Sequence, residues 1–349
     1  RDVLGSRGLG DVYKRQNGNK RLKTIQQEKL NNQMAELDVA TSENNIQESI
    51  AQVYIQILYA AESVKVNENT LQVSIAQRDR GQELLNAGSI AKSDLAQLEA
   101  QVSTDRYQLV TAQATLEDYK LQLKQLLELD GENEMNIYLP ALSDENVLAP
   151  LPTKRDVYIS ALSLRPEIEA SKLNVEASEL GINIAKSSYF PTISLSAGIG
   201  TNHTSGSDFT FGEQVKNGWN NSIGLSVSVP IFNNRQTKSA VQKAKLQYET
   251  SMLSLLDEQK ALYKTIESLW LDANSAQQRY AAANEKLKST QISYELISEQ
   301  FNLGMKNTVE LLTEKNNLLQ AQQEQLQAKY MAILNTQLLK FYQGDQLAI

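Results

Sequence analysis

Two long stretches of the chain repeat apolar residues at helical spacing and contain almost no glycine or proline. They run from about 17 to 85 and from about 234 to 303. Each is followed by a glycine-containing turn and a second helical stretch, from about 92 to 129 and from about 308 to 342. Apolar residues at every third or fourth position with few helix breakers are typical of long amphipathic helices. The pattern therefore predicts two long helical hairpins.

The second arm of the first hairpin shows the apolar stripe most clearly. Its seam alternates spacings of three and four residues and has one polar break, at Asp105: Leu95, Leu98, Val102, Asp105, Leu109, Ala112, Leu116, Tyr119, Leu123 and Leu126. Such a seam is typical of a coiled coil. Extra apolar residues beside it widen the stripe, as expected for a helix with a neighbour on each side. At roughly 1.5 Å per residue the first long helix would measure on the order of 100 Å, so the hairpin has to bury its stripe against neighbouring helices. Because the stripe is wide enough for a neighbour on each side, we expect the helices to pack into a ring.

The two hairpins are copies of one unit at a constant offset of 216 residues. The offset superimposes the two turn glycines and the acidic residue that follows each, in the pairs Gly88 with Gly304 and Asp94 with Glu310. It also matches Tyr54 with Trp270. A turn and a large aromatic residue that keep one offset without gaps indicate an internal duplication of a whole hairpin.

Between the hairpins the apolar period changes to two, over residues 192–200 and 222–230. The opposite face of both stretches holds only Ser, Thr and Gly. Alternation of this kind predicts strands, and about nine residues suffice for a tilted strand to cross a bilayer. We expect seven apolar side chains to face lipid and the small polar ones to face water: Ile193, Leu195, Ile199, Ile223, Leu225, Val227 and Val229. The alternative is a soluble hairpin laid on a core. The loop between the strands carries Phe209, Phe211 and Trp219, which suit an interfacial girdle.

Composition excludes several classes of function. A net charge of −7 argues against a nucleic-acid partner, and the absence of cysteine excludes disulfides and thiol chemistry. His203 is the only histidine, and the sequence has no phosphate-binding glycine loop, metal-ligand spacing or nucleophile elbow. No apolar run reaches the length of a transmembrane helix. We therefore predict no enzymatic activity and no cofactor.

Several local signatures occur in one order along the chain. Residues 165–168 (RPEI) open a helix, residues 189–195 (YFPTISL) enter the first strand, and residues 229–233 (VPIFN) leave the second. The two turns read GSIAKSDL from Gly88 and GMKNTVEL from Gly304. This ordered set, over about residues 17 to 343, resembles the TolC-type outer membrane efflux protein family.

The resemblance implies a fold that is mainly α with a β-hairpin. The long coiled-coil hairpins would form a segment of a periplasmic α-barrel, and the transmembrane strands would contribute to a β-barrel shared by a homotrimer. It implies a passive outer-membrane duct of a Gram-negative bacterium, in a tripartite efflux or type I secretion system. Its partners would be a periplasmic membrane-fusion adaptor, an inner-membrane pump and outer-membrane lipid. The sequence does not specify the cargo, because selectivity in such systems usually resides in the pump.

The repeat pattern and the family resemblance together predict the domain organisation. We expect the first hairpin at 17–129, an equatorial connecting segment at 130–164, a helix leading to the strands at 165–191, the strand hairpin at 192–230, the second hairpin at 231–342 and a tail at 343–349. Complete relatives carry a signal peptide, a helix and a first strand pair before the first hairpin. Residues 1–16 match none of these and have no signal-peptide core. We expect them to be unrelated to the fold, and the chain to be truncated at its N-terminus.

The resemblance also assigns candidate sites at the two turns. A gate network that closes the tunnel maps onto Ser93, Asp94, Phe301, Lys306 and Glu310. Three Glu310 carboxylates, one from each subunit, would favour cations in the pore. Adaptor docking maps onto Gly88, Ser89, Ile90, Gly304 and Met305. The simpler interpretation is a solvated helix reversal whose acids sit favourably in the first turn of a helix.

Two other functions remain open at this stage. A periplasmic adaptor also has a long helical hairpin, and the helices alone would suit a soluble coiled-coil scaffold. An adaptor has one hairpin rather than two, and a scaffold does not need strands of membrane length. The alternating strands therefore favour the duct.

Overall fold

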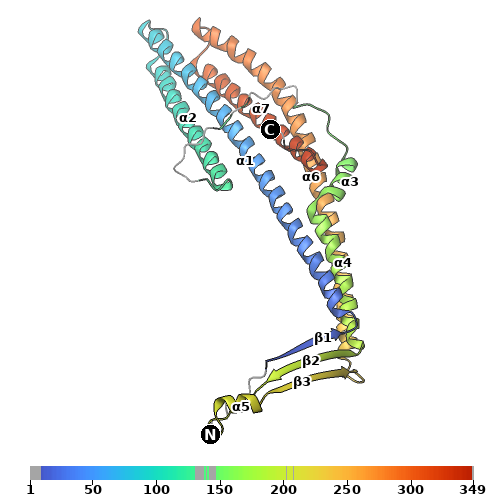
Figure 1. The fold of residues 1–349 in the computed structure, drawn as a ribbon. Coiled ribbons are helices and arrows are strands. Elements are labelled where there is room, and N and C mark those ends of the chain that lie inside the picture. The colour runs from blue at the N-terminus through green and yellow to red at the C-terminus, as the bar shows by residue number, and fades with distance from the viewer. Residues whose placement is uncertain are drawn as a thin grey trace. The chain divides into compact units, whose positions relative to one another are not determined.

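The computed structural model describes residues 9–129, 137–138, 140, 147–201, 203–206 and 208–347. These residues are mainly helical and include a three-stranded sheet. Two compact units can be distinguished. Unit 1 comprises the described residues up to Val39 together with Pro166–Gln259. Unit 2 comprises the described residues of 40–165 and of 260–349. Figure 1 shows the elements of both.

The sheet of unit 1 is antiparallel, in the order β1 (Leu9–Gln16), β2 (Thr192–Gly200) and β3 (Asn220–Ser228). The pairing of β2 with β3 runs from Thr192 opposite Ser228 to Gly200 opposite Asn220. Strand β2 has the predicted bounds, whereas β3 begins and ends two residues earlier than expected. Val229 therefore lies outside the strand, next to Pro230, which has no N–H for a ladder hydrogen bond. The different bounds do not change the alternation, so each side chain within the strand lies on the face that the pattern assigned to it.

Strand β1 differs from the expectation for residues 1–16. The backbone of Leu9–Gln16 pairs with β2, from Leu9 opposite Ile199 to Gln16 opposite Ile193, with an irregularity between Lys14 and Gln16. The free edge of β2 offers unpaired N–H and C=O groups that any extended segment can satisfy. Residues 1–8 lie outside the described residues.

Three helices of unit 1 pack beside one another. Helix α4 (Pro166–Lys186) is followed by a 3₁₀ turn, η2 (Ser187–Tyr189). Gln27 of α1 (Lys20–Asn86) donates to the carbonyl of Ala177 at 2.9 Å. On the other side, the hydroxyls of Ser178 and Ser251 lie 2.8 Å apart, which ties α4 to α6 (Gln236–Asn302). Helix α4 thus bridges α1 and α6.

The loop between β2 and β3 is more ordered than its composition suggested. A short helix, α5 (Phe211–Asn217), begins at Thr210, whose hydroxyl caps it while Glu213 accepts from the Thr210 N–H at 3.0 Å. The aromatic residues Phe209, Phe211 and Trp219 are exposed. Ser207 of this loop lies outside the described residues.

Unit 2 contains the paired arms of the two predicted hairpins. The first consists of α1 and α2 (Lys92–Leu126), and the second of α6 and α7 (Thr308–Gln343). Each helix boundary falls within three residues of the expected one. The core lies between the arms, and α1 and α7 contribute one of its clusters: Ile55, Leu58, Tyr330, Leu334 and Leu338.

The connecting segment is held against the hairpins by repeat-related aromatic residues. Tyr54 of α1 donates its hydroxyl to the carbonyl of Tyr138 at 2.7 Å, and Trp270 of α6 donates its indole N–H to the carbonyl of Pro152 at 3.0 Å. The segment also contains a helix that periodicity did not indicate, α3 (Lys154–Leu164), capped by Thr153. Residues 130–136, 139 and 141–146 of this segment and 348–349 of the tail lie outside the described residues.

Helix α3 ends at an arginine that joins three helices. Arg165 precedes Pro166, which restricts it to an extended backbone and ends the helix. Its guanidinium is buried, pairs with Glu48 of α1 at 3.3 Å and lies 4.2 Å from the ring centroid of Tyr342 in α7. The segment is therefore fixed to both hairpins. No described helix combines the length and the apolar character needed to cross a bilayer.

Candidate functional site

The first turn joins α1 to α2 through a glycine with left-handed backbone. Gly88 has φ +72°. Its N–H donates to the carbonyl of Leu85 at 2.9 Å, and the Ser89 N–H donates to that of Leu84 at 2.8 Å. This pair of bonds satisfies carbonyls at the end of α1. At the start of α2 the Asp94 carboxylate accepts from the Ala91 N–H at 3.0 Å.

The second turn has the same backbone. Gly304 also has φ +72°, its N–H donates to the carbonyl of Phe301 at 2.9 Å, and the Met305 N–H donates to that of Gln300 at 2.8 Å. Here Asn307 caps α7: its side chain accepts from the Glu310 N–H at 2.9 Å, and Glu310 accepts from the Asn307 N–H at 3.2 Å. The second turn therefore has a complete reciprocal cap.

At the second turn an ion pair connects the turn to the start of α7. Lys306 Nζ lies 2.5 Å from Glu310 Oε1, with both side chains about one third exposed. The hydrogen bond from Lys306, and after it the one from the Asn307 backbone, lowers the pKa of Glu310 below its ordinary value. Glu310 is thus held ionised at the start of α7, where the helix dipole also favours a negative charge.

The five predicted gate residues fall into separate environments. Lys306 and Glu310 contact each other, whereas Asp94 binds the start of its own helix and Ser93 is exposed. Phe301 is buried with Leu98 of α2 and Leu311 of α7. Within one chain, then, Phe301 belongs to the core beneath the turns, and one ion pair lies at the surface.

The predicted docking residues lie on the surface of both turns. Gly88, Ser89 and Gly304 are exposed, Ile90 is half-buried, and the side chain of Met305 is 71% exposed. Leu303 and Val309 beside Met305 are exposed as well. The second turn thus presents a small apolar surface next to the Lys306–Glu310 pair.

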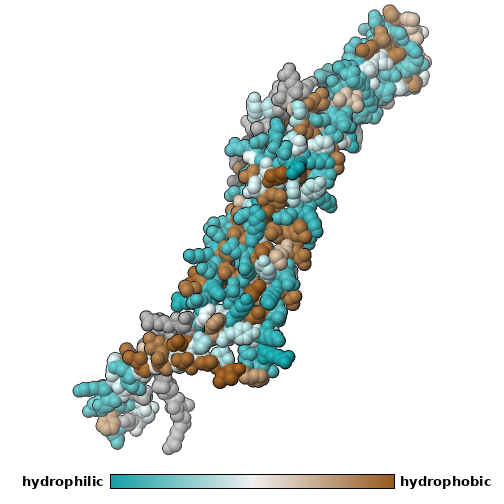
Figure 2. Space-filling view, turned by 90° about the vertical axis from the view of Figure 1, so that its right-hand side faces the viewer, coloured by the Kyte–Doolittle hydropathy of each residue, from teal (hydrophilic) through white to brown (hydrophobic). Residues whose placement is uncertain are grey.

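Six of the seven predicted lipid-facing residues share one face of the sheet, and Val229 lies beyond the end of β3. The register places Ile193 opposite Val227 and Leu195 opposite Leu225. Serine and glycine occupy the other face, as in the pair of Ser194 with Ser226. Ile223 is 84% and Leu225 71% exposed, and Figure 2 shows hydrophobic residues gathered along the sheet.

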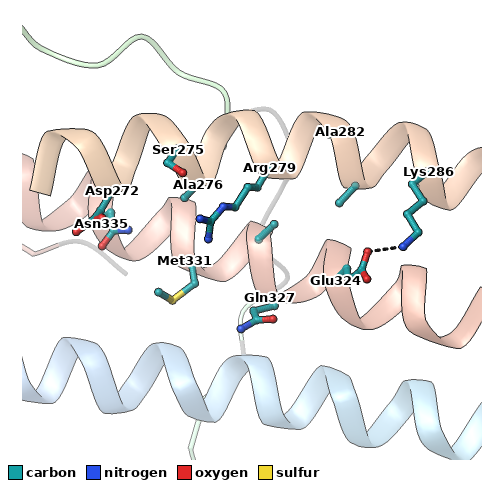
Figure 3. Close-up of a pocket in the computed structure, with 12 residues that line it drawn as sticks. Asp272, Ser275, Ala276, Arg279, Ala282, Lys286, Glu324, Gln327, Met331 and Asn335 are labelled. Atoms are coloured by element: carbon teal, nitrogen blue, oxygen red, sulfur yellow. Dashed lines mark hydrogen bonds and ion pairs between the residues drawn. The ribbon is translucent and has the colours of Figure 1, made fainter. Parts of the chain in front are cut away.

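A groove between α6 and α7 was not indicated by the sequence. Its cavity measures about 610 Å³, and its walls combine alanines with ionic side chains, among them Ala276, Ala328, Asp272, Arg279 and Met331. Lys286 bridges it to Glu324 at 2.7 Å (Figure 3). Small residues with an ionic rim form a surface on which a further helix can pack closely.

Sequence reasoning also missed a buried polar cluster. It identified Asp105 as a break in the α2 seam but not its partners, Ser74 of α1 and Lys315 of α7. A signal was present, because Lys315 lies between Leu311 and Leu318 at seam spacing. Among the described residues no three His, Asp or Glu side chains lie close enough together to hold a metal ion. His203 lies with its ring centroid 5.1 Å from that of Phe211.

Comparison with known proteins identifies relatives of this architecture. Residues 157–344 match the family model described as outer membrane efflux protein. The chain is 24% identical over 294 residues to the outer membrane efflux protein BepC of Brucella suis biovar 1 (strain 1330), a match that covers 84% of the chain and 61% of BepC. It is also 24% identical over 294 residues to the outer membrane protein TolC of Escherichia coli (strain K12), over 82% of the chain and 58% of TolC.

Among solved structures, the fold is similar to that of CusC, described with the conformational changes that accompany folding and transmembrane channel formation. The TM-score is 0.85 at 18% identity, covering 99% of this chain and 80% of CusC. At that identity the likeness establishes the fold. The chain spans about 60% of the length of the curated relatives it matches.

Proposed function

The chain belongs to the outer membrane efflux protein family, and we propose that it is a subunit of a passive export duct in the outer membrane of a Gram-negative bacterium. The observation that carries this proposal is the apolar face of β2 and β3, exposed along β3 and half-buried at Ile193 and Leu195 of β2, opposite a face of serine and glycine. Nine residues at about 3.3 Å each span the hydrocarbon core of a bilayer. Lipid would cover the apolar face and water the other.

The working unit is proposed to be a homotrimer. An open sheet edge is not tolerated in lipid, because its N–H and C=O groups have no partner there. Within the described part of the chain β3 pairs only with β2, so a strand from another subunit would complete the ladder. The α6–α7 groove supports the same assembly, since it offers a packing surface to a helix of a neighbouring subunit.

The two turns are proposed to form the periplasmic end of the duct. The exposed apolar surface around Met305 suits a protein partner, for which we propose a membrane-fusion adaptor bridging to an inner-membrane pump. The Lys306–Glu310 pair would contribute to the constriction of the tunnel. Exposed pairs contribute little stability, which suits a gate that has to open. The pump supplies the energy and selects the cargo, so small molecules and secreted proteins are both compatible with the duct.

The test is membrane extraction of the polypeptide as its native host produces it. We expect it in the outer-membrane fraction as a heat-resistant trimer released only by detergent. A positive charge on the lipid face costs about 2–4 kcal/mol at the middle of the bilayer, so Leu225→Arg should abolish the trimer. Ser226→Arg, on the opposite face of the same strand, should leave it intact. A water-soluble dimer, as a scaffold or adaptor would give, would contradict the proposal.

A further inference from the structure

Three polar side chains from three helices meet in the interior of unit 2. They are Ser74 of α1, Asp105 of α2 and Lys315 of α7, and they are 2%, 1% and 3% exposed. Lys315 Nζ donates to Ser74 Oγ and to Asp105 Oδ2, and Ser74 Oγ also donates to Asp105 Oδ2. Gln101 donates to the other carboxylate oxygen at 2.9 Å. Both oxygens of the buried carboxylate therefore have hydrogen-bond partners.

A gain in stability does not account for this cluster. Burial lowers the pKa of Lys315, and the hydrogen bond and charge of Asp105 only oppose that shift. Replacing a buried ion pair by apolar residues of similar size is often neutral or stabilising, whereas removing one partner is strongly destabilising. A buried pair in a coiled-coil seam has another well-attested use, which is to specify one register.

Both charged residues occupy seam positions. Asp105 follows Leu98 and Val102 along α2, and Lys315 lies between Leu311 and Leu318 on α7. A purely apolar seam tolerates a slip of one turn, because each slipped position meets another apolar residue. A slip here would bury Asp105 against an apolar position and leave Lys315 without its carboxylate. Only one axial position of α7 satisfies both groups.

The pair also breaks the symmetry of the internal duplication. The offset of 216 residues matches Asp105 with Ala321 and Lys315 with Glu99. The two repeats therefore do not carry equivalent charges in their second arms. A contact of α2 with a second α2 would place two carboxylates together, so the charges favour α7 as the neighbour of α2.

We propose that the Ser74–Asp105–Lys315 cluster fixes the axial register of α7 against the α1–α2 hairpin. Lys315 is seven residues from the start of α7, Ser74 is twelve from the end of α1, and the buried residues Leu98, Phe301 and Leu311 fill the space toward the turns. The cluster thereby sets the level of the second turn relative to the first. This positioning role follows from the packing of one chain and does not depend on the duct assignment.

The chain contains no cysteine, so introduced cysteine pairs can report the register in the full chain. Ser63 Oγ of α1 lies 3.1 Å from Gln323 Oε1 of α7, outside the cluster. The in-register reporter is Ser63→Cys with Gln323→Cys. The slipped reporters combine Ser63→Cys with Gln320→Cys or with Gln327→Cys, which lie about one turn to either side on the same helix face.

With the cluster intact, oxidation should close the in-register pair at least about tenfold faster than either slipped pair, because disulfide geometry is narrow. In the Asp105→Leu/Lys315→Met background the chain should still melt cooperatively, and the preference should fall to about threefold or less. The matched control is Lys286→Met/Glu324→Leu, an exposed pair between α6 and α7. It should retain the tenfold preference.

Undiminished preference in the Asp105→Leu/Lys315→Met background would overturn the proposal. So would loss of cooperative melting in that background, because the cluster would then be needed for folding itself. A loss of preference in the control would also overturn it, since any interhelical pair would then have the same effect.

Discussion

The two hairpin turns have one backbone and two different sets of side chains. Gly88 and Gly304 share φ +72°, and each turn is closed by hydrogen bonds of 2.9 and 2.8 Å. At the positions that follow, Ile90 and Ala91 of the first turn correspond to Lys306 and Asn307 of the second. The second turn therefore has an N-cap side chain that accepts from its helix and an ion pair between the turn and that helix, and neither has a counterpart at the matching positions of the first turn.

This difference separates what the fold needs from what is specific to one turn. Reversing the chain requires the left-handed glycine and its two hydrogen bonds, and duplication preserved both. The Lys306–Glu310 pair is not needed for reversal, since the first turn lacks a counterpart. The charged Lys306–Glu310 pair and the exposed Met305 therefore make the second turn the stronger candidate for the proposed gate and docking roles.

The largest expected effect tests whether the two turn backbones are equivalent. Gly88→Ala and Gly304→Ala each force an L-residue into left-handed backbone, which costs roughly 1–2 kcal/mol. No atom lies within 4 Å of the position of the added Cβ at either site, so the two losses should be equal. Urea denaturation of each variant measures them. Losses that differ by more than about 1 kcal/mol would show that the turns are not equivalent.

An exchange of caps should sharpen the comparison at a smaller magnitude. Asn307→Ala removes the acceptor of the Glu310 N–H and should lower the free energy of unfolding by about 1 kcal/mol. Ala91→Asn supplies the missing cap to α2 and should raise it by a similar amount. Equilibrium unfolding of both variants and of their combination is the measurement. If Ala91→Asn does not stabilise, the start of α2 differs from that of α7 in more than the side chain.

The smallest effect concerns the acid titration of Glu310. Because the Lys306 hydrogen bond lowers its pKa, the contact is complete above the ordinary carboxyl pKa and is lost as pH falls through the lowered value. Lys306→Gln should move the pKa of Glu310 upward, toward its ordinary range. Carboxyl carbon NMR of the two proteins measures the shift, and Glu213, whose lowered pKa depends on Thr210, serves as an unaffected control. An unchanged Glu310 pKa in the variant would mean that Lys306 does not hold the carboxylate.

The spacing of apolar residues predicted the helices and strands whose formation depends mainly on residues close together in the sequence. The hairpins follow from helical periodicity and two turn glycines, and β2 and β3 follow from alternation. The end of β3 was placed two residues late, because the pattern continues to Val229 whereas the ladder ends with Ser228 opposite Thr192. The gate and docking roles of the turn residues remain predictions.

Features that depend on tertiary pairing could not be predicted in this way. Lys315 and Ser74 appear ordinary in sequence until α1, α2 and α7 bring them to Asp105. Strand β1 likewise depends on an edge that β2 provides. Helix α3 is short and its seam too brief to show a period, and its bounds follow from Thr153 and Pro166 instead.

Single-channel recording in planar bilayers tests the duct and its second turn together. The polypeptide as its native host produces it should conduct ions without an energy source, and Lys306→Glu should raise the conductance by replacing an attraction to Glu310 with a repulsion. Ile90→Glu, at the matching position of the first turn, should change it less. A protein that does not conduct would contradict the duct assignment, and a Lys306→Glu conductance equal to that of the unchanged protein would remove the second turn from the gate.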